Sequence, residues 1–223
     1  MRFEPLSNFV DEEIIQSFGI IWDHLGESGA WWTGAQRIAI AEEVRISAPR
    51  PLWDKAPHLG SFSDEVDGQL TYFEKGIVER VTVEPSSIDL ETYQEIISRI
   101  GEDKYAELAA VVSQVVPIDH LHDALGIERE QLPPVNDTAT TMERPEDLVY
   151  DVGFLPTLPT DGLPHVAVAL SLALADNARR MLLVRSMYSG QSFEEMVWTH
   201  RNLSRPQIEL VAARTSALNE CFY

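Results

Sequence analysis

Apolar positions recur at helical spacing through most of the chain, which predicts a fold built from helices. Stop signals follow some of these segments, with Gly26 after the first and Gly101 after the third. Strand-like alternation is scarce, so the sequence predicts an all-α fold. The expected helices span residues 10–26, 33–47, 86–101, 103–116, 117–127, 163–188, 193–203 and a last one that starts after Ser204.

Capping residues sharpen several of these boundaries. Ser86 or Ser87 is expected to cap the helix over 86–101. Ser204 and Gln207 have the spacing of a capping box, which predicts the start of the last helix. Residues 70–83 remain open between a helix and a short strand over VERVTV.

Residues 128–164 interrupt the helical pattern with six prolines and predict a long connection over the surface. The sequence therefore divides into an N-terminal helical half at 1–127, a proline-rich connection at 128–164 and a C-terminal helical half at 165–223. A weak echo between residues 41–53 and the chain end allows the two helical halves to be related.

The charge balance excludes some classes of partner. The 223 residues carry a net charge of −19, and residues 1–150 hold 29 acidic and 11 basic side chains. Such a surface repels phosphate backbones, so we expect no nucleic-acid partner. No stretch of 18 apolar residues and no signal peptide is found, so we expect a cytoplasmic protein with no membrane association. A single cysteine fits a reducing compartment.

The only cysteine, Cys221, lies in the stretch LSRPQIELVAARTSALNECFY at residues 203–223. This stretch resembles the core of the AhpD-like alkylhydroperoxidase family, which also contains the carboxymuconolactone decarboxylases. The family pattern is a helix with a glutamate, a Ser–x–x–Asn-like turn, a Cys–x–x–Cys motif and a histidine four residues further. Glu209 precedes Cys221 by 12 residues, the family spacing, and Ser216 and Asn219 fall at the turn. WWTGAQRIAIAEEVR, IGEDKYAELAAVV and LPHVAVALSL also resemble family members.

The resemblance implies an AhpD-like fold and a peroxidase with a thiol redox pair and neither cofactor nor metal. It implies a hydroperoxide substrate, a thiol electron donor and a homo-oligomer. Cys221 would be the resolving residue, and Glu209 would relay protons. The attacking residue would be at position 224 and the histidine at 228, so we expect the 223-residue chain to be inactive or nearly so. A shortened gene, a cut chain or a stop codon read as selenocysteine would each give this end, and the nucleotide sequence after codon 223 distinguishes them.

The resemblance implies that Glu209 and Cys221 come together, which requires the family's turn between them. On one continuous helix, 12 residues span roughly 18 Å, so the two side chains could not meet. A turn at Asn219 would let the chain fold back and would place Cys221 in the first turn of a new helix, where the dipole stabilises a thiolate.

Other polar residues compete for a role. His165 at a predicted helix start is assigned to the site lining, as is His200 near Trp198. The polar residues of the run IDHLHD at 118–123 are interpreted as surface caps or solvated side chains rather than metal ligands, since histidines two apart on a helix point in different directions. A non-catalytic relative that binds a small apolar ligand or a partner is the alternative function, and a decarboxylase-like lyase is a third. Trp31, Trp32 and Trp53 are expected in the core or an interface.

Overall fold

The computed structural model describes residues 2–49, 55–190 and 202–220, and the side chain of Ser189 is not described. The predicted all-α class is confirmed, because helices account for nearly all regular structure in these ranges. The predicted helix at 193–203 lies almost wholly outside them, as does Trp53. The helices are α1 (Glu12–Leu25), α2 (Gly34–Ser47), α3 (Tyr72–Val83), α4 (Leu90–Ile100), α5 (Glu102–Leu125), α6 (His165–Val168), α7 (Leu174–Val184) and α8 (Arg205–Leu218).

Short elements complete the described chain. One small antiparallel hairpin pairs Val66 with Thr71 and Asp67 with Leu70. The short helical turns and strands are η1 (Glu4–Asn8), η2 (Leu59–Ser61), β1 (Val66–Asp67), β2 (Leu70–Thr71), η3 (Pro85–Ser87) and the π-helical turn η4 (Arg185–Ser189).

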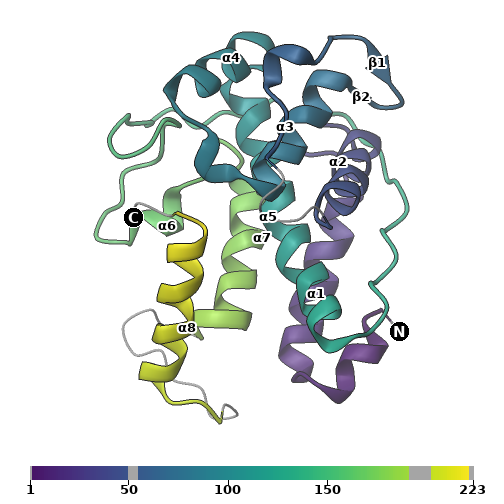
Figure 1. Ribbon diagram of the computed structural model, residues 1–223, viewed down its shortest axis with the longest axis vertical. Coiled ribbons are helices and arrows are strands. Elements are labelled where there is room, and N and C mark those ends of the chain that lie inside the picture. The colour runs from purple at the N-terminus through teal and green to yellow at the C-terminus, as the bar shows by residue number, and fades with distance from the viewer. Residues whose placement is uncertain (1, 50–54, 191–201, 221–223) are drawn as a thin grey trace.

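Helix α5 is the centre of the fold (Figure 1). Helices α1, α2, α3, α4 and α7 all pack against it, and α1 also contacts α7. Helix α8 lies at the outside in the same view, and Ile208 is its one buried residue. No helix in the described ranges has the length and apolar character needed to span a bilayer.

Capping boxes form where the sequence carries Ser or Thr followed three residues later by Gln or Glu. Thr33 with Gln36 opens α2, and the predicted box of Ser204 with Gln207 opens α8. The predicted cap at Ser86 or Ser87 is wrong. Asp89 caps α4 instead, because residues 85–87 form a separate turn and the Asp89 carboxylate accepts a hydrogen bond from the Thr92 amide.

Two of the expected elements near the centre differ from the structure. Residues 103–116 and 117–127 form one helix, α5, with Pro117 inside it. An internal proline costs about 3 kcal/mol, and burial of Val111, Val115 and Ile118 on both sides of it offsets this cost. The strand alternative for VERVTV is wrong, because these residues complete α3.

The single helix expected over residues 163–188 is broken into α6, α7 and η4. Side chains of α7 satisfy the carbonyls that the break leaves open. Asn177 Nδ2 donates to the Ala167 carbonyl at 2.8 Å, and Arg180 donates to the Val166 carbonyl. The run of apolar residues over 163–188 therefore does not form one continuous helix, because polar side chains of α7 hydrogen-bond to backbone carbonyls of α6.

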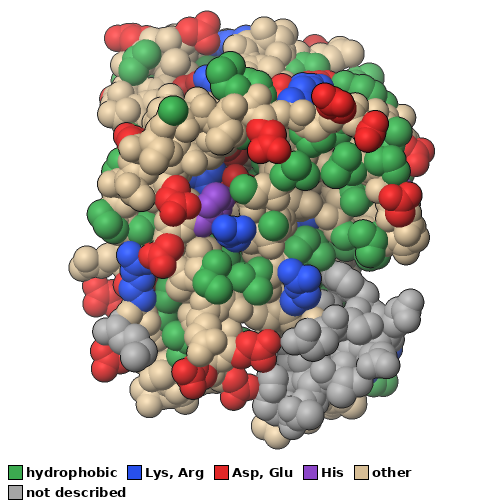
Figure 2. All heavy atoms as spheres, turned by 180° about the vertical axis from the view of Figure 1, so that it is seen from behind, with side chains coloured by type: hydrophobic (Ala, Val, Ile, Leu, Met, Phe, Trp, Pro, Cys, Tyr) green, Lys and Arg blue, Asp and Glu red, His purple; other side chains and the backbone are tan. Residues whose placement is uncertain are grey.

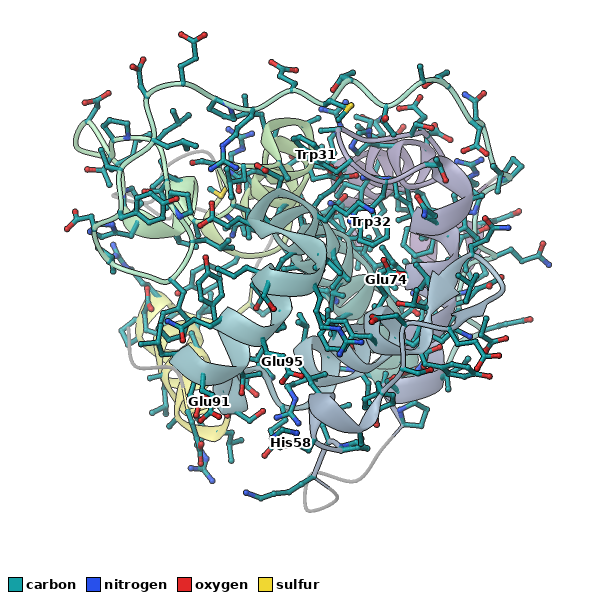
Figure 3. The ribbon with its side chains drawn as sticks, turned by 90° about the horizontal axis from the view of Figure 1, so that it is seen from above. Trp31, Trp32, His58, Glu74, Glu91 and Glu95 are labelled. Carbon is teal, nitrogen blue, oxygen red and sulfur yellow. The ribbon has the colours of Figure 1, made fainter. Side chains whose placement is uncertain are left out.

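The predicted connection over 128–164 contains no helix and runs along the outside of the helices (Figure 1). Trp31 and Trp32 lie in the segment that leads into α2 (Figure 3). Trp32 is fully buried, as expected of a core residue, and its indole donates to the Lys104 carbonyl. Acidic side chains are spread over the face seen in Figure 2 rather than gathered in one patch.

Candidate functional site

Glu209, one of the two residues expected to act chemically, lies in the second turn of α8. Tyr188 of the η4 turn donates a hydrogen bond from Oη to Glu209 Oε2 at 2.9 Å. Arg205 Nε lies 3.6 Å from Glu209 Oε1. The glutamate side chain is 42% exposed, so it is both held in place and open to solvent.

The hydrogen bond to Glu209 also affects Tyr188. Burial first, and then this hydrogen bond and the glutamate charge, raise the pKa of the Tyr188 phenol. The phenol therefore stays protonated at neutral pH and remains a hydrogen-bond donor to the carboxylate. Such a pair can hold in one orientation a carboxylate that remains partly open to solvent, where it could exchange protons with a reacting group.

Cys221 and His200 lie outside the described residues. The structure does show how the chain approaches Cys221. Helix α8 ends at Leu218, Asn219 takes the C-cap position, and Glu220 has a positive φ of 53°. The chain thus leaves the helix at Asn219, where the sequence predicted a turn.

His165, the other residue assigned to the lining, begins α6. It lines a cavity of about 400 Å³ together with side chains of the 150s. His165 therefore lies at a cavity, as expected of a lining residue. Glu209 lies on a different helix and is not among the described residues that line this cavity.

A buried ionic cluster was not predicted from the sequence. Arg37 is fully buried, and its Nη1 donates to Glu107 Oε1 at 2.8 Å. Arg37 Nη1 and Nη2 also donate to the two carboxylate oxygens of Asp176, at 3.0 and 2.7 Å. Gln114 Nε2 donates to Asp176 Oδ1 at 3.1 Å, and His24 Nε2 lies 3.3 Å from the same oxygen. This Arg37 cluster joins α1, α2, α5 and α7.

The pKa values of the two carboxyls in the Arg37 cluster shift in opposite directions, because burial and the Arg37 charge oppose each other and a different one prevails at each carboxyl. Burial alone would raise the pKa of Asp176, but the Arg37 charge and hydrogen bonds from His24 and Arg37 outweigh it and lower that pKa. Burial raises the pKa of Glu107, and the attraction of Arg37 only partly opposes this. Asp176 is therefore the principal counter-ion of Arg37.

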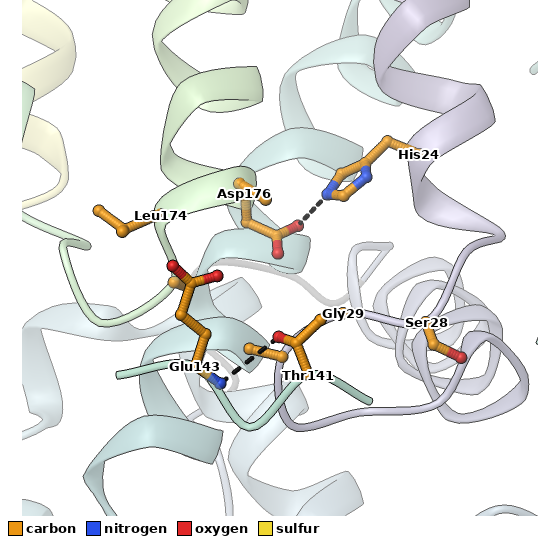
Figure 4. A pocket seen from close by; sticks show the side chains of 10 residues that line it. His24, Ser28, Gly29, Thr141, Glu143, Leu174 and Asp176 are labelled. Carbon is orange, nitrogen blue, oxygen red and sulfur yellow. Dashed lines mark hydrogen bonds and ion pairs between the residues drawn. The ribbon is translucent and has the colours of Figure 1, made fainter. Parts of the chain in front are cut away.

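A small cavity of about 120 Å³ lies beside the Arg37 cluster (Figure 4). His24, Glu143 and Asp176 contribute polar side chains to its lining, and Ser28 and Leu174 lie at its edges. At about 30 Å³ per water, the volume corresponds to a few water molecules. Among the described residues, no three His, Cys, Asp or Glu side chains are placed to hold a metal ion.

The run at 119–123 is less solvated than expected. Asp119 is buried and receives two hydrogen bonds from Arg45, at 2.8 Å each. His122 is also buried, and its Nδ1 lies 2.8 Å from the Ile118 carbonyl. The interpretation as solvated residues was wrong for these two side chains, because α5 continues past Pro117 and carries its buried face to this point.

Only a weak sequence signal could have identified the Arg37 cluster. Arg37 and Asp176 each stand among apolar and small residues, at positions that helical spacing assigns to a buried face. A charged residue at such a position implies a buried partner, but the sequence does not say which one.

Comparison with known proteins adds no assignment: no family model, curated protein or solved structure matches this chain.

Proposed function

We propose that this chain carries the resolving half of a thiol peroxidase site, with Cys221 as the resolving thiol and Glu209 as its proton-relay residue. The observation that carries the proposal is the hydrogen bond from Tyr188 to Glu209, because it holds the one carboxylate that has the motif spacing to Cys221. The exposed fraction of Glu209 and the end of α8 at Leu218 are consistent with this role.

The proposed reaction needs a second redox residue at position 224, after Tyr223. Its thiolate or selenolate attacks the terminal oxygen of an organic hydroperoxide, the O–O bond breaks, and the alkoxide takes a proton to leave as an alcohol. The thiolate of Cys221 then attacks the resulting sulfenic or selenenic acid. Hydroxide leaves and is protonated to water, and the new S–S or S–Se bond is reduced by an external dithiol. Glu209 supplies and accepts the protons.

The test compares the 223-residue chain with the same chain extended to carry cysteine at position 224 and histidine at position 228. Consumption of cumene hydroperoxide is measured with dithiothreitol as the electron donor. We expect turnover only from the extended chain, and its loss in Cys221→Ser. Turnover that survives Cys221→Ser unchanged refutes the role of the cysteine.

Glu209→Gln in the extended chain should lower turnover by about 10²-fold or more, the usual contribution of a general acid or base. Glu13→Gln, which removes an exposed carboxylate on α1, is the matched control and should leave turnover unchanged. Equal rates for the two variants would remove Glu209 from the mechanism.

A further inference from the structure

The cavity that His165 lines is formed where the 150s segment covers α5 and α6. Its volume is about 400 Å³. Val152, Phe154, Leu155 and Val166 contribute apolar side chains to the wall, and Tyr105 of α5 also lines it. None of the described residues that line it is Asp, Glu, Lys or Arg. An uncharged lining favours a neutral ligand, because a charged one would lose its hydration without gaining an ion pair.

The covering segment is fixed before any ligand binds. Phe154 stacks on Tyr93 with ring centroids 5.2 Å apart. Val149 and Thr157 exchange two backbone hydrogen bonds, at 2.8 and 2.9 Å, which close the base of the loop. Tyr150 Oη donates to Glu102 at 3.1 Å. A wall held in this way gives a largely pre-formed site, which is typical of small-molecule pockets.

The volume limits the size of the ligand. An apolar cavity of about 150 Å³ is known to accept benzene. The present cavity is more than twice as large, so it fits a molecule of about two fused rings or an aliphatic chain of similar volume.

Tyr105 contributes a phenol to the lining, which also contains Thr157 and His165. Tyr105 is 8% exposed. Burial raises the pKa of this phenol to about 12, so the group stays protonated and can donate. An acceptor on a ligand in the cavity could receive a hydrogen bond from this phenol, which is already largely removed from water.

We propose that this cavity binds a neutral, apolar molecule of about two rings that presents one hydrogen-bond acceptor to Tyr105. Exposed apolar side chains of Val152 and Phe154, at 44% and 43%, mark its edge and offer a path for such a molecule. Glu209 is not among the described residues that line the site, so Glu209→Gln should leave the affinity unchanged whether or not the peroxidase proposal holds.

The test is titration calorimetry of the 223-residue chain with 2-acetylnaphthalene, naphthalene and 2-naphthoate. We expect saturable binding of the first two and at least tenfold weaker binding of the charged third. Tyr105→Phe keeps the ring and removes the donor, so it should weaken 2-acetylnaphthalene binding by about 2- to 12-fold and leave naphthalene unchanged. Equal losses for both probes, or none for either, would overturn the role of Tyr105.

Filling variants locate the binding. Val166→Trp should abolish binding of both neutral probes, and Ala169→Trp, at an exposed position of the same lining, is a second filling variant. Leu163→Trp is the matched control outside the lining, since Leu163 is 58% exposed. Circular dichroism checks that each variant is folded. Saturable binding that both filling variants leave intact, or no saturable binding to the wild type up to the solubility of the probes, refutes the proposal.

Discussion

The Arg37 cluster provides the sharpest test of how this fold is held together. Arg37→Met keeps most of the side-chain volume and removes the charge. Glu107 and Asp176, which are 0% and 2% exposed, would then lie close together without their cation. Breaking a buried ion pair by removing one partner costs about 3–5 kcal/mol. For a chain of this size that corresponds to a fall in Tm of about 6–20 °C.

Urea unfolding followed by circular dichroism measures this loss, and two variants control for it. Arg45→Met removes a partly exposed guanidinium from Asp119, while Arg129 remains 3.7 Å from that carboxylate, so the expected loss is about 1–2 kcal/mol. Glu107→Gln leaves Arg37 balanced by Asp176 and should cost less than Arg37→Met.

The pH dependence separates a charge effect from a packing effect. In the wild type the pKa of Asp176 is lowered, so its stabilising contribution is present above about pH 4 and is lost as the pH falls through its folded-state pKa. In Arg37→Met both carboxyls lack the cation, and their folded-state pKa values should lie above the unfolded ones. The stability of the variant should therefore rise as the pH falls from 7 to 5. A loss below about 1 kcal/mol, or one independent of pH over this range, would refute the reasoning.

Three further predictions concern backbone and capping positions, each measured by thermal unfolding. Gly29→Ala should destabilise the fold by about 2 kcal/mol or more, because the added methyl group would collide with the buried Glu107 carboxylate. Gly19→Ala places its methyl group in open space on a helix and should stabilise the fold by about 0.5–1 kcal/mol. Equal effects of the two variants on stability would contradict the structure. Thr33→Ala removes the cap of α2 and should cost about 1 kcal/mol, with Thr33→Ser retaining the wild-type stability within about 0.5 kcal/mol. Asn177→Ala should lower the stability by about 1 kcal/mol and speed amide hydrogen exchange over residues 164–173. Unchanged exchange there would show that the hydrogen bond to the Ala167 carbonyl does not stabilise the segment between α6 and α7.

The sequence predicted most helices because their positions depend on local signals. Apolar spacing, the glycine stops and the capping box at Ser204 act within a few residues, and the structure follows them. The errors arose where distant contacts override local ones. Pro117 does not start a helix because its neighbours are buried on both sides, and the 163–188 segment breaks because Asn177 and Arg180 bind α6.

The candidate site likewise has features that the sequence predicts and features that depend on distant contacts. The turn at Asn219 could be expected from the family resemblance of residues 203–223, in which Ser216 and Asn219 fall at the turn. The hydrogen-bond partner of Glu209 could not, because Tyr188 comes from a π-helical turn that no local pattern indicated. The cavity beside His165 also depends on the 150s segment, whose path is fixed by contacts with Tyr93 and Glu102 rather than by its own sequence.

The sequence separation within the Arg37 cluster has a consequence during protein synthesis. Glu107 follows Arg37 by 70 residues, and Asp176 follows it by 139. At about 5–20 residues per second, the ribosome completes Asp176 about 7–28 s after Arg37. A nascent chain that already holds α1 to α5 can pair Arg37 with Glu107 in the meantime. Docking of α7 would then follow, and it would complete the buried charge network only after most of the chain has been translated.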